Sequence, residues 1–219
     1  AALQAAATDD VCAVLFECVQ GEGGVNNLSP TFVSAIAKLA KEKDILIAVD
    51  EVQTGNGRTG DLYSYQHFGI QPDVVSTAKG LAGGLPMGAC LLSEKAADVL
   101  TPGTHGSTFG GNPVCCAGAI SILSRLNEET LAGVRERSES IMNELTGVPG
   151  VRSVTGLGLM LGVETERPAA NVIRACRESG VLVISAKEGS GLDALETEIA
   201  QRCPSGTEQQ GELLNNARQ

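Results

Sequence analysis

The segment Ile45–Gln53 constrains the fold of this 219-residue chain more than any other stretch. Its first five residues, Ile45–Val49, are all apolar, and four of them are β-branched or leucine, which predicts a buried strand of a parallel sheet. The strand ends in two adjacent carboxylates, Asp50 and Glu51. Open α/β sheets bind ligands at the carboxyl ends of their strands, so Asp50 is a candidate site residue. The alternative for Asp50 alone is a helix cap or a turn residue.

A second short strand, expected over Val74–Thr77, leads to Lys79. Taken alone, Lys79 would be a solvated loop lysine. Because the carboxyl ends of parallel strands meet at one edge of a sheet, Asp50 and Lys79 can instead face a single cofactor. The glycine-rich segment Gly55–Gly60 lies between the two strands and favours this interpretation, and Arg58 is expected to brace that loop.

The N-terminal part predicts a strand–helix–strand unit. Val11–Val19 is apolar except for Glu17 and predicts a buried strand. Ser29 is a suitable N-cap with Pro30 at the first helical position, and apolar residues through Ala40 then fall on one helical face. Such a βαβ unit requires parallel strands and a right-handed crossover.

The remaining segments predict an α/β fold with a mostly parallel sheet flanked by helices. A domain change is expected near Gly147–Gly150, where Pro149 and two glycines interrupt the pattern. The other expected elements are a strand over Met87–Leu92, a short helix capped by Ser93, helices from Pro113 to about Leu126 and over Glu129–Leu145, two short strands within Val151–Val163, a helix over Asn171–Ser179 and a strand over Val181–Ile184.

Composition narrows the function classes. The content of hydrophobic residues is 42% and glycine occurs 27 times, which suits a globular α/β protein with many tight loops. The net charge of −10 argues against nucleic acid or an anionic membrane surface as a partner, and no apolar run has membrane-spanning length. Seven cysteines without CxxC spacing favour a reducing, cytoplasmic compartment. His67 and His105 lack metal-ligand neighbours, so no metal site is expected.

Three motifs, in their order and spacing, resemble the class III aminotransferases, and within that class the acetylornithine aminotransferases. The resemblance covers residues 1 to about 187. The motifs are Asp50-Glu51-Val52-Gln53 followed by Gly55–Gly60, Pro72-Asp73 leading into Ser76–Gly80, and His105–Pro113.

The resemblance implies a partial pyridoxal phosphate (PLP)-dependent transferase of fold type I. Residues 1–147 would be the C-terminal part of the large domain, 148–187 the start of a small α+β C-terminal domain, and 188–219 a divergent tail. The implied reaction moves the terminal amino group of an N-acetylornithine-like donor to the 2-oxo acid 2-oxoglutarate, as in arginine biosynthesis. The implied assembly is a homodimer with shared active sites.

The resemblance also assigns roles around the cofactor. Lys79 would bind PLP covalently, Asp50 would pair with the pyridine nitrogen, and Gln53 would reach the phenolic oxygen. Val52 would pack on the ring face, with plain core packing as the alternative. Thr108 would contact the cofactor phosphate from the neighbouring subunit.

Three further residues are implied on the substrate side. Ser107 would lie next to the substrate, and Glu17 and Glu22 match two acidic positions of the family. Glu22 resembles the acid that pairs with a substrate-binding arginine, with a solvated loop glutamate as the alternative. Cys18 stands where the family usually has proline.

Two departures from the family leave alternatives open. The sequence starts in the middle of the family's large domain, so the phosphate loop, the aromatic that stacks on PLP and a substrate arginine are not in it. The resemblance stops after Lys187. Transamination of ornithine or 4-aminobutyrate is therefore an alternative. A catalytically incompetent remnant that only pairs with a full-length subunit is another.

Overall fold

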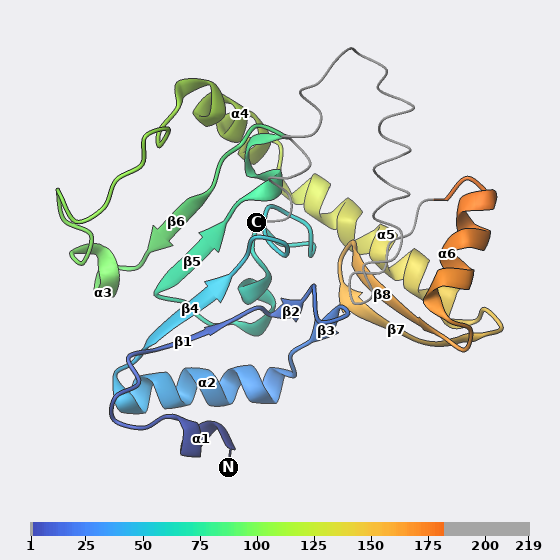
Figure 1. The fold of residues 1–219 in the computed structure, drawn as a ribbon, viewed down its shortest axis with the longest axis horizontal. Coiled ribbons are helices and arrows are strands. Elements are labelled where there is room, and N and C mark those ends of the chain that lie inside the picture. The colour runs from blue at the N-terminus through green and yellow to red at the C-terminus, as the bar shows by residue number, and fades with distance from the viewer. Residues whose placement is uncertain (1, 182–219) are drawn as a thin grey trace. The chain divides into compact units, whose positions relative to one another are not determined.

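A computed structural model describes residues 2–181 of the chain (Figure 1). Its centre is a four-stranded sheet in the order β1-β4-β5-β6. The strands β1, β4 and β5 are parallel to one another, and β6 is antiparallel to β5. The expected α/β class with a mostly parallel sheet is confirmed. The sheet strands are β1 (Ala13–Phe16), β4 (Leu46–Asp50), β5 (Val74–Thr77) and β6 (Ala89–Leu92).

Strand β4 lies inside the sheet and determines where Asp50 points. Ile47 and Val49 are buried in a core cluster, whereas Ala48 and Asp50 are half-buried. Because successive side chains of a strand point to opposite faces, Asp50 lies on the face opposite this core cluster. Its backbone pairs with Ser76 of β5, so the predicted strand ends do lie next to each other.

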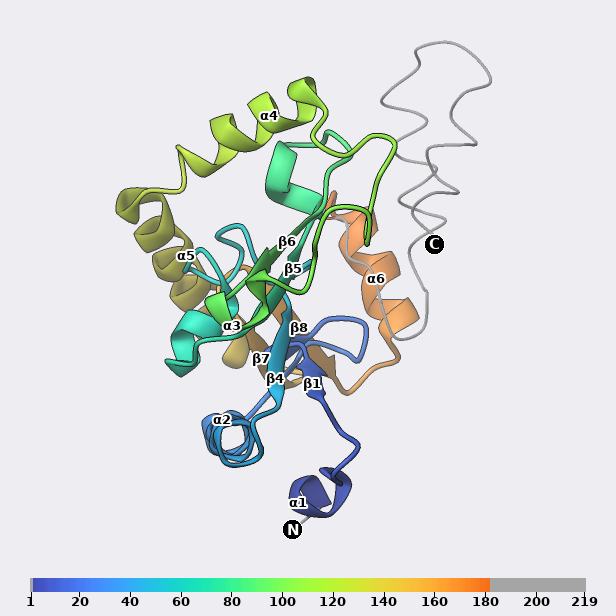
Figure 2. The ribbon, with the colours of Figure 1, turned by 90° about the vertical axis from the view of Figure 1, so that its left-hand side faces the viewer.

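Helix α2 (Pro30–Lys43) packs on the core-cluster face of β1 and β4, which is the face opposite Asp50 (Figures 1 and 2). The Ser29 side chain accepts a hydrogen bond from the backbone N–H of Phe32 at 3.2 Å, which confirms the predicted N-cap. The helix ends at Asp44, which has a left-handed φ of 52°. Val33 and Ala40 pack against the β4 residues in the core cluster, as the apolar face predicts.

Strand β1 differs from the buried strand expected over Val11–Val19. It covers four residues at the edge of the sheet, and the Leu15 side chain is 71% exposed. Val14 and Phe16 pack on the core cluster from the other face. The chain then turns into a short antiparallel pair, β2 (Val19–Gln20) with β3 (Asn26–Asn27). A strand is buried on both faces only where other elements pack on both of them, and α2 packs on only one face of β1.

Asp73 ties β4, β5 and β6 together at the end of the sheet away from Asp50. Its Oδ2 accepts from the backbone N–H of Ile47 at 2.9 Å, and its Oδ1 accepts from Ser93 Oγ at 3.0 Å. Ser93 is the N-cap residue of the short helix α3 (Glu94–Ala97), as predicted, although the helix ends before Leu100. Its hydroxyl makes no capping bond and donates to Asp73 instead.

The later elements agree closely with expectation. Asn112 and Asn127 cap α4 and α5 with their side chains, and β7 pairs with β8. None of the described helices is long and apolar enough to cross a membrane. The remaining elements are α1 (Ala2–Ala6), α4 (Pro113–Leu123), α5 (Glu128–Thr146), β7 (Val151–Leu157), β8 (Met160–Thr165), α6 (Ala169–Glu178) and the 3-10 turns η1 (Ser64–Phe68) and η2 (Lys79–Ala82).

The chain forms two compact units. Within the described residues, one unit comprises residues 2–21 together with Val25–Glu164, and the other comprises Glu22–Gly24 with residues 165–181. The domain boundary expected near residue 147 stays a prediction. The strand expected over 181–184 and the tail from 188 lie outside the described residues.

Candidate functional site

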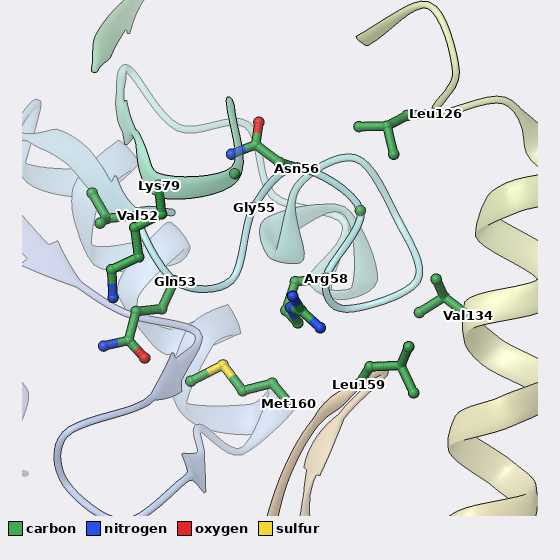
Figure 3. A pocket seen from close by; sticks show the side chains of 12 residues that line it. Val52, Gln53, Gly55, Asn56, Arg58, Lys79, Leu126, Val134, Leu159 and Met160 are labelled. Carbon is green, nitrogen blue, oxygen red and sulfur yellow. The ribbon is translucent and has the colours of Figure 1, made fainter. Parts of the chain in front are cut away.

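A pocket of about 450 Å³ opens where β4 and β5 end (Figure 3). It lies within the first compact unit, between the turns after these strands, helix α5 and the tip of the β7–β8 hairpin. Its walls include Val52, Gln53 and Lys79 at one end and Leu126, Val134 and Leu159 at the other. Three residues that the sequence singled out are thus brought together.

Lys79 follows β5 by one residue and begins the turn η2. Its φ is 47°, a left-handed conformation that costs a non-glycine residue about 1–2 kcal/mol. Among the residues that line the pocket, only Lys79 and Arg58 carry a charge, and a guanidinium does not lose its proton in proteins. Among the described lining residues, Lys79 is therefore the one that carries an amine able to act as a nucleophile or as a base.

Asp50 stands next to the pocket but does not line it. Its Oδ1 accepts a hydrogen bond from the backbone N–H of Val52 at 2.9 Å. This contact between residues i and i+2 is a side-chain turn that ends the strand. It directs the chain from β4 to Val52 and Gln53, which do line the pocket.

Glu51, the neighbouring carboxylate, has a different environment and is fully buried. Its Oε1 accepts from Ser64 Oγ at 2.8 Å and from the backbone N–H of Tyr65 at 3.0 Å. Its Oε2 accepts from Thr54 Oγ1 at 2.5 Å and from the backbone N–H of Ser64 at 3.0 Å. Four donors satisfy the carboxylate, so Glu51 holds the turn after β4 onto η1.

The side chain of Gln53 lies close to Gly21. A Cβ at position 21 would lie 2.3 Å from Gln53 Oε1 and 2.9 Å from Met160 Cε, so a larger residue there would displace the ends of these side chains from their present positions. The backbone N–H of Gly21 donates to Glu17 Oε2 at 3.2 Å. Glu17, expected on the substrate side, thus fixes the turn that gives Gln53 its space, and it does not line the pocket.

The glycine loop is braced mainly through its backbone. The Arg58 carbonyl accepts from the backbone N–H of Leu159 at 2.9 Å, and the Gly60 carbonyl accepts from Arg135 Nη1 at 2.5 Å. The Arg58 side chain, expected to brace the loop, lines the pocket and is exposed. A Cβ at Gly158 would lie 2.4 Å from the Thr59 carbonyl carbon, so the hairpin tip and this loop are in direct contact.

Asn56 is a site residue that the sequence did not single out. Its Nδ2 donates to Thr77 Oγ1 at 3.1 Å and to the Ala78 carbonyl at 3.0 Å. These bonds join the glycine loop to the end of β5, immediately before Lys79. A local sequence pattern cannot predict the contact between Asn56 and Ala78, because the two residues are 22 positions apart. The asparagine within a glycine-rich run, at a left-handed φ of 56°, was the only available signal.

The remaining expected residues lie away from this pocket. Ser107 and Thr108 are exposed in the segment between α3 and α4, and neither lines the pocket. Glu22 is exposed and belongs to the second compact unit. Their roles stay predictions. Residues 2–181 contain no cluster of three His, Cys, Asp or Glu side chains that would hold a metal ion.

The chain is similar to known proteins over most of its length. The family model "Aminotransferase class-III" matches residues 1–193. An acetylornithine aminotransferase from Haemophilus ducreyi is 48% identical over 183 residues, which are 83% of this chain and 47% of that protein. One from Aquifex aeolicus is 45% identical over 175 residues, 80% of this chain and 46% of that protein. The chain thus spans about half the length of the curated relatives it matches.

The chain is also similar to solved structures of aminotransferases. The N-acetylornithine aminotransferase from Stenotrophomonas maltophilia has a TM-score of 0.75 at 33% identity, covering 84% of this chain and 50% of that one. An ornithine aminotransferase from Toxoplasma gondii, with PLP at partial occupancy in its active site, has a TM-score of 0.76 at 36% identity. That match covers 86% of this chain and 46% of the other. The expected fold class, part of the PLP-dependent aminotransferase fold, is confirmed.

Proposed function

The chain belongs to the class-III aminotransferase family, and we propose from this that it forms the lysine-bearing half of a PLP-dependent aminotransferase site. The observation that carries the proposal is the position of Lys79. Among residues 2–181, it supplies the only side-chain amine on the wall of a pocket that also contains Val52 and Gln53. Lysine, a ring-packing apolar side chain and an amide are the groups that the family resemblance assigns to PLP.

The residues present fit that cofactor. PLP offers an aldehyde to an amine, a pyridine nitrogen to a carboxylate and a phenolic oxygen to a hydrogen-bond donor. Lys79, Asp50 and Gln53 match these in turn: Asp50 is the last residue of β4, Gln53 follows β4, and Lys79 follows the neighbouring strand β5. Gly21 keeps open the space that Gln53 occupies, because a Cβ there would overlap its amide. When bound, PLP supplies the electron sink for the reaction.

The residues of the chain itself would have the remaining roles. The Asp50 carboxylate, oriented by the Val52 N–H, would hold a proton on the pyridine nitrogen. The Lys79 Nζ would attach the cofactor and would move a proton during the reaction, since it is the lining amine among the described residues. Val52, Leu159 and Met160 present apolar surface to the pocket, against which an apolar ring face would pack.

We further propose a homodimer with shared sites in the cytoplasm. Thr108 and Ser107 lie outside the pocket of their own chain, which suits contact with the phosphate and substrate of a neighbouring subunit. Glu17 and Glu22 are proposed on the substrate side. The amino donor is N-acetylornithine or a close analogue, the acceptor is 2-oxoglutarate, and the setting is arginine biosynthesis. Support for this donor comes from the acetylornithine aminotransferases that are 41–49% identical to the chain.

A second donor, ornithine, is favoured by one observation. Ornithine aminotransferases of Toxoplasma gondii and Plasmodium falciparum match this structure as well as the acetylornithine enzyme does, with TM-scores of 0.76 and 0.74. A donor comparison separates the two candidates. A chimaera completed with the N-terminal half of an acetylornithine aminotransferase is assayed with N-acetylornithine, ornithine and 4-aminobutyrate, each with 2-oxoglutarate.

The proposal predicts a PLP absorbance band and the fastest turnover with N-acetylornithine. Faster turnover with ornithine would reassign the donor. A chimaera that binds no PLP and transfers no amino group would identify the chain as an incompetent remnant. Lys79→Ala in the same chimaera is the control, and it is expected to lose both the absorbance band and the activity.

A further inference from the structure

The side chain of Asn56 is bonded to the backbone that leads into Lys79. Its Nδ2 donates to the Ala78 carbonyl at 3.0 Å and to Thr77 Oγ1 at 3.1 Å. On the other side of Lys79, Gly80 lies close to Asn56, since a Cβ built on Gly80 would come within 3.8 Å of the Asn56 Cβ. The bonds of Asn56 are thus to the residues before Lys79, and Asn56 also lies near the residue after it.

The orientation of the Asn56 amide is fixed by chemistry. The Ala78 carbonyl can only accept a hydrogen bond, so the NH₂ group and not the oxygen must face it. Asn56 Oδ1 then ends up buried, and it has no hydrogen-bond partner among the described residues. An unpaired buried oxygen is unfavourable. In this structure that cost is offset by the two bonds that the NH₂ group makes to the end of β5.

Both Asn56 and Lys79 have left-handed backbones, with φ of 56° and 47°. Asparagine tolerates this conformation, whereas lysine rarely adopts it and needs surrounding contacts to stay there. Two anchors flank Lys79. Ala78 is held by Asn56, and Leu81 is buried and donates its N–H to the Ala78 carbonyl at 3.0 Å.

We propose that Asn56 is a positioning residue for Lys79: its amide holds the backbone of Ala78 so that Lys79 keeps the left-handed conformation from which its amine reaches the pocket. This rests on the proposed function for the part that concerns PLP. Figure 3 shows the Asn56 amide directed at the backbone next to Lys79, while the Lys79 side chain extends toward Gln53. Asn56 acts through the backbone and has no role in the chemistry itself.

Two variants separate the amide from the left-handed conformation. Asn56→Asp keeps the shape and the tolerance for positive φ, but its carboxylate cannot donate to the Ala78 carbonyl. Asn56→Gly keeps only the tolerance for positive φ. Asn143→Ala, at an exposed position on α5, is the matched control. Thermal unfolding of each 219-residue chain establishes that the variant folds.

The first readout does not involve PLP. Amide hydrogen exchange of residues 78–82, measured by mass spectrometry, is expected to accelerate several-fold in Asn56→Asp and Asn56→Gly and to stay unchanged in Asn143→Ala. Unchanged exchange in both Asn56 variants would overturn the inference, because the backbone around Lys79 would then be held without the amide.

The second readout is capture of PLP. Each chain is incubated with PLP and reduced with borohydride, and modified Lys79 is compared with modified Lys38, which is 78% exposed. Capture at Lys79 is expected to fall at least about tenfold in both Asn56 variants, because misplacing a reacting group by an ångström is costly. Capture at the wild-type level would overturn the inference. Faster exchange in the variants, with no preference for Lys79 over Lys38 in the wild-type chain, would instead contradict the proposed function and leave the Asn56–Lys79 link supported.

Discussion

Ser64 donates two hydrogen bonds to the buried carboxylate of Glu51, one from its backbone N–H at 3.0 Å and one from its hydroxyl at 2.8 Å. This relationship connects the turn after β4 to η1 across 13 residues of sequence. It explains why two adjacent carboxylates, Asp50 and Glu51, differ in role. One is fully enclosed by donors, and the other remains half-buried beside the pocket.

Changing Glu51 to Gln is expected to lower the free energy of unfolding by about 1–3 kcal/mol. Each oxygen of Glu51 accepts from one backbone N–H, that of Tyr65 or of Ser64, and a backbone donor cannot turn into an acceptor. Whichever end becomes NH₂ therefore faces another donor. Urea unfolding measures the change.

The matched control is Glu42→Gln, because Glu42 forms an exposed ion pair with Lys38 at 3.7 Å. That change is expected to stay within about 0.5 kcal/mol. Equal stability of the Glu51→Gln and Glu42→Gln chains would contradict the role assigned to Glu51.

Changing Asp50 to Asn is expected to leave the fold and PLP binding intact and to slow transamination by about 10²–10³. The Asn oxygen can still accept from the Val52 N–H, so the turn survives, but the charge that we propose pairs with the pyridine nitrogen is lost. Turnover of the completed chimaera measures the effect, with the exposed Asp98→Asn as control. Unchanged turnover in Asp50→Asn would remove Asp50 from the site.

Cys18 is expected to resist thiol reagents in the folded chain. The side chain is fully buried beside Ser64, and burial raises the pKa of the Cys18 thiol from 9.0 to about 11. Cys12 and Cys90 are exposed and provide the comparison within the same molecule. They should react with a thiol reagent at pH 8, whereas Cys18 should react only after unfolding. Rapid reaction of Cys18 would contradict its burial.

The raised pKa of Cys18 also predicts a pH dependence of stability. The unfolded chain loses this proton near pH 9 and the folded chain only near pH 11, so the stabilisation is complete below pH 9 and is lost between these values. The loss amounts to about 2–3 kcal/mol. Tyr63 and Tyr65 also have raised pKa values, so Cys18→Ala isolates the thiol. The variant should lose less stability from pH 9 to 11 than the wild-type chain.

The 219-residue chain alone is expected to self-associate and to hold PLP loosely. Helix α4 leaves Val114 63% and Ile120 69% exposed, and β1 is an open edge with Leu15 exposed. Apolar patches and free strand edges of this kind promote association. Size-exclusion chromatography checks it, and the N-terminal half of a relative supplied in trans should improve solubility and PLP retention together. A monodisperse chain that binds PLP tightly would contradict this expectation.

The sequence predicted the parts of the fold that depend on local patterns. The apolar run before Asp50 and the strand before Lys79 are where expected, and α2 begins after Ser29. Strand β1 was mistaken for a fully buried strand, because a position at the edge of a sheet is a property of the fold and not of nine residues. Ser93 is at the predicted N-cap, but the sequence does not predict its bond to Asp73, because the two residues lie 20 positions apart.

The same limit applies to the site. Val52, Gln53 and Lys79 were found through strand ends and a family resemblance, and the pocket brings them together. The sequence does not predict the bonds of Asn56 to β5 or those of Glu51 to Ser64 and Tyr65, because each joins residues that are 13 to 22 positions apart. Thr108 lies away from the pocket, and its role is a proposal about a neighbouring subunit.

The most direct test of the central claim is the site of covalent PLP attachment. The wild-type chain and Lys79→Ala are each completed with a relative's N-terminal half, incubated with PLP, reduced with borohydride and mapped by peptide mass spectrometry. The account predicts one predominant modification, on Lys79 in the wild-type protein, and none above the background of exposed lysines in Lys79→Ala. Equal fixation of PLP in the two proteins would contradict the assignment of Lys79.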